Sequence, residues 1–211
     1  MLKTIYRAAA GAFIALAVGM QYWLLVREET AGVMAASSLK FFSFFTILTN
    51  VLAAATLLVP VIAPQSWAGK FLARPSVRTA VTGYIIMVGV VYYLLLRDVS
   101  QRQGWPLFFE QMLHYVTPPL FVLDWLAFVP KRELNWRVGL GAMGFPLVYL
   151  AWTLAHGAAT GWYPYPFVDV VELGYPRALA NIAGLVLVFL ALEVALVGVG
   201  RAIEQRIGPT T

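Results

Sequence analysis

Apolar residues form long runs along this chain, and short polar or proline-rich breaks separate them. Such runs are typical of membrane-spanning helices, because about 20 consecutive apolar residues are needed to cross the hydrocarbon core of a bilayer. The pattern predicts six spans, with limits at residues 7–26, 38–63, 79–97, 107–130, 136–155 and 177–199. We therefore expect an all-α polytopic membrane protein in which residues 1–211 form a single six-helix transmembrane domain.

The composition supports this class. Hydrophobic residues make up 61% of the 211 residues and charged residues only 12%, whereas soluble domains carry about 25% charged residues. Too few polar side chains exist to cover the surface of a soluble globule, and the apolar content excludes a disordered chain. Cysteine is absent, which excludes disulfides, thiolate catalysis and cysteine-ligated metals.

The basic residues are unevenly distributed between the loops on the two sides of the membrane. Because Lys and Arg are retained in cytoplasmic loops, the richer side indicates the cytoplasm. This side holds Lys3, Arg7, Lys70, Arg74, Arg78, Lys131, Arg132, Arg137, Arg201 and Arg206. The other side holds Arg27, Lys40, Arg97, Arg102 and Arg177. We expect a multi-pass protein of the cell (plasma) membrane with both termini in the cytoplasm. The net charge of +5 then reports topology, and no nucleic-acid partner is expected.

The second and fourth predicted spans carry polar side chains, which are expensive in a bilayer unless they have a partner or a function. Ser43, Thr46 and Asn50 are spaced by three and four residues, so they are expected on one helical face. Taken alone, they could simply bond the preceding turn or hold helices together.

A stripe of the fourth span is more informative. Its members, at helical spacing, are Glu110, His114, Thr117, Phe121 and Asp124. Titratable groups on one face should point into the bundle, away from lipid. Pro118 and Pro119 follow and remove backbone donors, which predicts a kink. Asp124 and Glu193 fall in the inner third and are expected to tie helices together through basic residues at the cytoplasmic rim.

Polar residues of the second and fourth predicted spans are expected at a similar depth below the outer membrane surface. Both begin on the outer side, so Thr46 and His114 are each expected about 10–12 Å below that surface at ~1.5 Å per residue. A hydroxyl beside an imidazole is a nucleophile with its base. At this depth the pair would meet a lipid ester. We predict an intramembrane hydrolase of lipid esters that uses Thr46 or Ser43 as nucleophile and His114 as base. Asn50 would donate to the oxyanion, while Glu110 and Asp124 would orient the imidazole or the substrate.

The outer loop after the fifth span is rich in aromatic residues and prolines. It follows His156 and contains Trp162, Tyr163 and Asp169. One interpretation is an aromatic belt at the membrane interface. The other is a lid over an outward-facing pocket, in which these residues bind or orient the lipid substrate.

Three segments resemble the androgen-induced membrane protein family. They are Phe45-Thr46-Ile47-Leu48-Thr49-Asn50, His114-Tyr115-Val116-Thr117-Pro118-Pro119 followed by Asp124-Trp125, and His156 to Asp169 with Trp162-Tyr163-Pro164-Tyr165-Pro166-Phe167. The resemblance is to the prokaryotic branch of predicted six-helix membrane proteins. Animal members hydrolyse fatty acid esters of hydroxy fatty acids with an intramembrane threonine and a histidine.

The resemblance carries the family histidine, which a proline follows one turn later, onto His114. It carries the family threonine onto Thr46 if Phe45-Thr46-Ile47-Leu48 sets the alignment, and onto Ser43 if Lys40-Phe41-Phe42 does. We prefer Thr46 because the apolar pattern after it matches better.

Other functions would use the same residues differently. A transporter or non-enzymatic ligand-binding membrane protein could use the stripe of Glu110, His114 and Asp124, and would need a polar path through both leaflets. Haem ligation by His114 and His156 is disfavoured because one histidine lies near a helix end. Zinc would need further ligands, such as Asp169 or Glu110. We therefore predict no cofactor and no metal, and the sequence predicts no particular oligomeric state.

Overall fold

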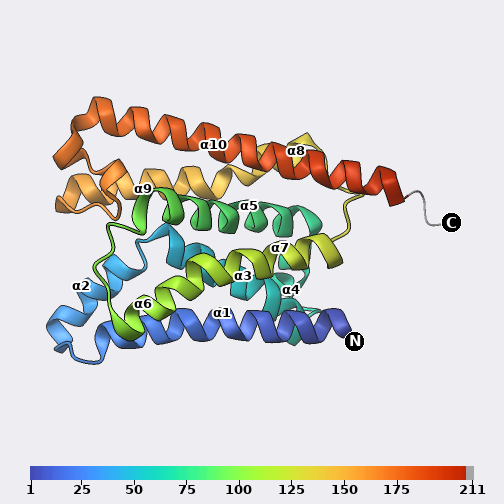
Figure 1. Ribbon diagram of the computed structural model, residues 1–211, viewed down its shortest axis with the longest axis horizontal. Helices are drawn as coiled ribbons and strands as arrows, with labels where there is room; N and C mark the ends of the chain where they lie inside the picture. The colour runs from blue at the N-terminus through green and yellow to red at the C-terminus, as the bar shows by residue number, and fades with distance from the viewer. Residues whose placement is uncertain (208–211) are drawn as a thin grey trace. The chain divides into compact units, whose positions relative to one another are not determined.

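In the computed structural model, residues 1–207 are described, and every element among them is helical (Figure 1). The all-α prediction is confirmed. Among these residues, five helices are long and apolar enough to cross a membrane: Leu2–Val26, Phe45–Ile62, Pro75–Leu96, Trp136–Thr160 and Val170–Arg206. The chain divides into two compact units, residues 1–130 and a second unit that begins at Lys131. Each unit is described by itself, and the single domain over residues 1–211 stays a prediction.

The first unit contains nine helical segments. They are α1 (Leu2–Val26), α2 (Ala31–Phe41), α3 (Phe45–Ile62), α4 (Trp67–Leu72), α5 (Pro75–Val91), η1 (Tyr92–Leu96), α6 (Gly104–Gln111), η2 (Met112–Val116) and α7 (Thr117–Phe128). Long α1 packs along α3, and α5 packs along both α3 and α7. The fourth predicted span corresponds to α6, η2 and α7, which follow one another without interruption. Its polar residues make it less apolar than the five helices above.

The second predicted span is not one helix, and this part of the prediction was wrong. Helix α2 ends at Phe41 and α3 begins at Phe45, so Ser43 lies in a break rather than on a helical face with Thr46. The Ser43 hydroxyl donates to the carbonyl oxygen of Leu39 at 2.8 Å, and Phe44 is extended. Hydroxyl side chains that bond nearby backbone compete with helix continuation in this way. As a result, Thr46 lies in the first turn of α3.

Two π-helical turns interrupt the helices that face each other across the first unit. In η2, the backbone N–H of Thr117 bonds to the carbonyl of Met112, five residues earlier. Because Pro118 has no N–H, the chain cannot keep α-helical bonding through this region. The predicted irregularity near the prolines therefore takes the form of a π turn that contains His114. The second turn, η1, begins at Tyr92.

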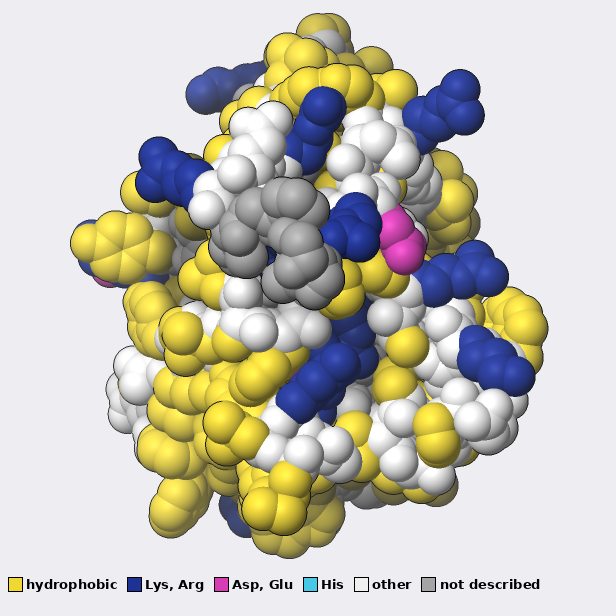
Figure 2. Space-filling view, turned by 90° about the vertical axis from the view of Figure 1, so that its right-hand side faces the viewer, with side chains coloured by type: hydrophobic (Ala, Val, Ile, Leu, Met, Phe, Trp, Pro, Cys, Tyr) yellow, Lys and Arg dark blue, Asp and Glu magenta, His cyan; other side chains and the backbone are white. Residues whose placement is uncertain are grey.

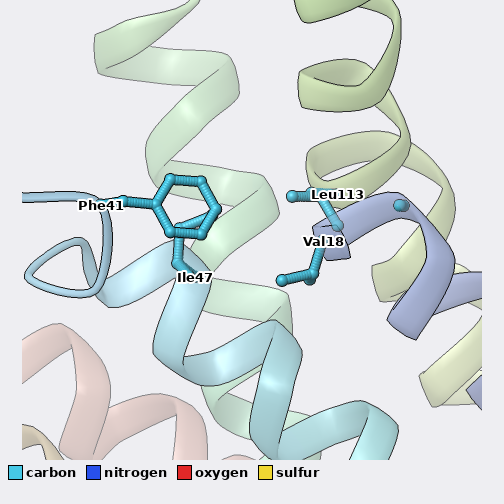
Figure 3. Packing of buried hydrophobic residues seen from close by; sticks show 5 residues of the cluster. Val18, Phe41, Ile47 and Leu113 are labelled. Atoms are coloured by element: carbon cyan, nitrogen blue, oxygen red, sulfur yellow. The ribbon is translucent and has the colours of Figure 1, made fainter. Parts of the chain in front are cut away.

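An apolar cluster joins the break after α2 to η2 (Figure 3). Its buried members are Ala17, Val18, Phe41, Ile47 and Leu113. Ile47 is the neighbour of Thr46, and Leu113 is the neighbour of His114. Packing these two apolar side chains into one cluster therefore brings the adjacent polar side chains to the same level of the unit.

In the second unit, the helices on either side of the aromatic loop have limits that differ from those of the fifth and sixth predicted spans. Its elements are α8 (Trp136–Ala142), α9 (Gly144–Thr160), η3 (Pro166–Val168) and α10 (Val170–Ile207). The fifth predicted span corresponds to Trp136–Thr160, in which a turn at Met143 separates α8 from α9, and it continues beyond residue 155. Helix α10 begins seven residues before the predicted 177, and its early part is kinked at Gly174, where φ is +71°. Glycine adopts this left-handed conformation without a steric penalty.

Replacing Leu113 with Ala tests the role of the cluster. Leu113 is fully buried, so the substitution leaves a cavity, and we expect the free energy of unfolding to fall by about 2–4 kcal/mol. Thermal unfolding in detergent measures the loss. Leu126→Ala is the matched control, because Leu126 is 47% exposed on the surface of α7. An equal effect of both substitutions would contradict a specific role for the cluster.

Candidate functional site

Thr46 and His114 meet in the first unit. The Oγ1 of Thr46 lies 3.3 Å from Nε2 of His114, and both side chains are buried. The two residues are 68 positions apart in the chain and come from α3 and η2. The prediction that they lie at one level is confirmed by this contact.

The contact of the second ring nitrogen of His114 shows which nitrogen of the ring carries the hydrogen. Its Nδ1 lies 2.7 Å from the backbone carbonyl oxygen of Glu110. A carbonyl only accepts hydrogen bonds, so Nδ1 carries the hydrogen. In the neutral ring Nε2 then has the lone pair, and the Thr46 hydroxyl donates to it. This is the arrangement of a hydroxyl and a general base whose ring is held by a third group.

Tyr92 fixes the imidazole from its face. The rings of Tyr92 and His114 stack with centroids 3.8 Å apart and an angle of 22° between their planes. Gly89, one turn earlier in the chain, permits this approach. A Cβ at that position would lie 3.1 Å from the carbonyl oxygen of His114 and 3.1 Å from Pro118. Sequence reasoning missed Tyr92, because a tyrosine in an apolar span gives no signal of its own.

Glu110 acts on the imidazole through its backbone rather than its carboxylate. The carboxylate oxygen Oε2 accepts a hydrogen bond from Ser100 at 2.8 Å and lies 4.0 Å from Nε of Arg102. Ser100 and Arg102 belong to the segment between η1 and α6. Glu110 therefore anchors this segment with its side chain and orients His114 with its carbonyl.

Two other predicted residues lie near Thr46 but are engaged by the backbone. The Nδ2 of Asn50 donates to the carbonyl oxygen of Thr46 at 2.8 Å, which ties the amide to the first turn of α3. The Thr46 hydroxyl lies within hydrogen-bond distance of His114 Nε2, and the Ser43 hydroxyl donates to the Leu39 carbonyl.

Asp124 lies apart from this pair, in an ion-pair cluster. Its Oδ1 lies 2.6 Å from Nε of Arg7, and its Oδ2 lies 3.1 Å from Nη2 of Arg7 and 3.0 Å from Nη1 of Arg78. Arg78 also donates to the carbonyl of Thr56 at 2.7 Å. The expected pairing of Asp124 with basic residues is confirmed, and it joins α7 to α1 and α5.

Glu193 was also expected to tie helices together through basic residues, and this prediction was wrong within residues 1–207. Its side chain is fully buried on α10, and neither carboxylate oxygen has a hydrogen-bond partner there. Gly139 of α8 packs near its backbone, where an added Cβ would lie 3.7 Å from the Glu193 carbonyl. Small residues at this contact allow α8 to approach α10 closely.

The remaining predicted residues lie in the second unit. The His156 ring stacks on Trp152 with centroids 5.4 Å apart and meets Trp162 edge to face at 5.9 Å. This aromatic group is local to the end of α9 and the loop that follows it. A lid over Thr46 and His114 stays a prediction, as does a belt at the interface.

The loop after α9 is tightly folded against its own helices. The Tyr163 ring packs over Gly157, where an added Cβ would overlap the ring. Burial raises the pKa of the Tyr163 hydroxyl. Asp169 caps α10, because its Oδ1 accepts from the backbone N–H groups of Val171 at 2.8 Å and Glu172 at 3.2 Å. Asn181 donates to the carbonyl of Phe167 at 2.9 Å and holds the loop on α10.

No group of three or more His, Cys, Asp or Glu side chains suited to a metal ion is present among residues 1–207. A hydroxyl beside a neutral imidazole, as at Thr46 and His114, can pass its proton to the ring and attack as an oxygen nucleophile. Comparisons of the chain with protein-family models, with curated proteins and with solved structures find no match. Membership of the androgen-induced family stays a prediction.

The stack of Tyr92 on His114 can be tested by chemical modification. His114 is buried beneath the ring, so we expect diethyl pyrocarbonate to modify it much more slowly than His156, which is partly exposed. Tyr92→Ala should speed the modification of His114 several-fold, and Tyr92→Phe should not, because it keeps the aromatic face. Peptide mass spectrometry gives both rates. Equal rates in the two variants would contradict the stack.

The ion-pair cluster predicts a large effect of Asp124→Asn. Removing the carboxylate leaves two buried guanidinium groups uncompensated, which costs about 3–5 kcal/mol of unfolding free energy. Thermal unfolding in detergent measures the change. Asp98→Asn is the control, because its side chain is 87% exposed and pairs only with the neighbouring Arg97 within the described residues. A variant Asp124→Asn as stable as the original chain would show that the pairing does not stabilise the unit.

Proposed function

We propose that the chain is an intramembrane hydrolase of lipid esters in which Thr46 is the nucleophile and His114 the general base. The observation that carries the proposal is the chain of contacts from Thr46 through Nε2 of His114 to the Glu110 carbonyl. The Nδ1 bond fixes the tautomer, and the Tyr92 stack fixes the plane of the ring. A hydroxyl needs such a base in order to attack an ester.

The reaction proceeds in two halves. In the first, Thr46 Oγ1 attacks the ester carbonyl while its proton moves to Nε2 of His114. The tetrahedral intermediate then collapses, the ester C–O bond breaks, and the departing alkoxide takes the proton from Nε2 to leave as an alcohol. In the second half, water gives a proton to Nε2 and attacks the acyl-threonine. Collapse of this intermediate returns the proton to Thr46 and releases the carboxylic acid.

The position of Thr46 supports stabilisation of the developing negative charge. Thr46 lies in the first turn of α3, and the dipole of this 18-residue helix favours an anion at its N-terminal end. The bond from Asn50 to the Thr46 carbonyl holds that turn in place. The break at Ser43 is what places Thr46 at a helix start, which a continuous second span would not have done.

A lipid ester fits the surroundings of the pair. Thr46 and His114 belong to a unit whose helices are apolar, and an apolar cluster packs beside both residues. The resemblance to a family whose animal members hydrolyse fatty acid esters of hydroxy fatty acids favours the same class of substrate. The outward-facing site, the cell membrane location and the six-span topology with both termini in the cytoplasm belong to this proposal.

The transporter alternative has no specific observation in its favour. A proton or substrate relay along Glu110, His114 and Asp124 would need Asp124 to be accessible. Its carboxylate is instead fully buried and bonded by Arg7 and Arg78. Phe121, which lies on the stripe between His114 and Asp124, is also fully buried.

Substitution of the pair tests the proposed activity. We expect Thr46→Ala to abolish acyl transfer to the protein, and His114→Ala to lower kcat about 10²–10⁴-fold, the contribution of a general base. Hydrolysis of a fatty acid ester of a hydroxy fatty acid, and labelling by a fluorophosphonate probe, measure the two steps. Unchanged hydrolysis after His114→Ala would refute the mechanism.

Two control variants separate the nucleophile from its neighbours. Thr49→Val removes a hydroxyl that is buried three residues further along α3, and it should leave turnover unchanged. Ser43→Ala should also retain most of the activity, because the Ser43 hydroxyl bonds to the Leu39 carbonyl. Loss of labelling in Ser43→Ala, with labelling retained in Thr46→Ala, would assign the nucleophile to Ser43.

A further inference from the structure

Positive charge is in excess around Asp124. Two guanidinium groups, from Arg7 and Arg78, share this single carboxylate, and Arg78 and Asp124 are almost completely buried. Lys3 precedes Arg7 by one helical turn on α1, so the two side chains lie on one face. Its charge acts on the same group of residues. Among the described residues, Asp124 is the acidic side chain that forms ion pairs with Arg7 and Arg78.

The arginines also have donors that the protein does not use. The Nε of Arg78 is buried and has no acceptor within residues 1–207. Arg7 uses Nε and Nη2 for Asp124, and its Nη1 has no protein acceptor in the described chain. A buried donor without a partner costs free energy, and an unpaired buried charge costs more. The Arg78 Nε therefore leaves one buried donor that an additional acceptor would satisfy, and an acceptor with negative charge would also offset the excess of positive charge.

The place of the cluster indicates what that acceptor is. Helices α1 and α5 begin, and α7 ends, at the same end of the first unit (Figure 1). Arg7, Arg78 and Asp124 all lie within two turns of these helix ends. Lys3, Arg7, Lys70, Arg74 and Arg78 belong to the part of the first unit near these helix ends, and dark blue Lys and Arg side chains are visible in the view from this side (Figure 2). It is also the end that the distribution of basic residues assigns to the cytoplasm.

We propose that Lys3, Arg7 and Arg78 form a binding site for a phosphate-bearing anion at this end of the first unit. Guanidinium groups match the geometry of phosphate oxygens, and basic clusters between helices at the cytoplasmic surface bind anionic lipid headgroups. The phosphate belongs to such a headgroup or to a free anion. In either case Asp124 holds the two arginines in position, and Lys3 closes the site from the surface.

Ligand-dependent stability of the full chain in detergent tests the site. Added phosphatidylglycerol should raise the midpoint of thermal unfolding, while zwitterionic phosphatidylcholine should not. Lys3→Gln should weaken the response, shifting the half-saturating phosphatidylglycerol concentration about fivefold, as expected for one basic residue near the headgroups. This variant leaves the ion pairs of Asp124 intact, so folding is not at risk.

Lys70→Gln is the matched control. Lys70 is exposed on α4 and belongs to neither ion pair of Asp124. It should respond to phosphatidylglycerol like the original chain. Sodium phosphate, compared with sodium chloride at equal ionic strength, separates the sources. Stabilisation by phosphate alone that Lys3→Gln weakens assigns the site to a free anion. Equal responses to the two lipids together with no response to phosphate, or an unchanged response in Lys3→Gln, would overturn the proposal.

Discussion

The ion pair of Asp124 with Arg7 and Arg78 is the constraint on which the first unit depends. These three side chains are buried away from water, so the carboxylate and the guanidinium groups need partners of opposite charge. Asp124 meets this demand by joining α7 to α1 and α5. These helices also position the site residues. Tyr92 lies in η1, which continues α5, and His114 lies in η2, which leads directly into α7. Charge pairing at one end thus fixes the helices that hold the polar pair.

Departures from regular helix create the candidate site itself. The break between α2 and α3 places Thr46 in a first helical turn, and two π-helical turns present Tyr92 and His114 to each other. Insertions of this kind change which way a side chain points without ending the helix, and they are frequent at functional sites. Gly89 removes the side chain that would otherwise separate the two helices at this level. Local irregularity and close approach therefore act together.

Simple physical limits predicted from the sequence the all-α membrane class, the meeting of Thr46 with His114, and the pairing of Asp124 with basic residues, but not which basic residues these are. Long apolar runs, helical spacing and depth were enough to place Thr46 and His114 at one level. The same reasoning failed at Ser43, since hydrophobicity does not distinguish a continuous span from two helices joined by an extended Phe44. It also gave no sign of Tyr92 or of the Glu110 carbonyl, because ring stacking and backbone orientation depend on packing rather than on residue type. The carboxylate of Glu110 was expected to face the imidazole, and the π turn presents the carbonyl instead.

The stack of Tyr92 on His114 has a further consequence for the proposed reaction. During each half of the cycle the imidazole takes up a proton and becomes a cation in a buried, apolar setting. The face of an aromatic ring carries negative electrostatic potential, and a cation above it is attracted. With centroids 3.8 Å apart, the phenol ring lies where that attraction acts. The ring that holds the base in place in the resting state would then also lower the energy of its charged form, so one contact would serve both positioning and charge stabilisation.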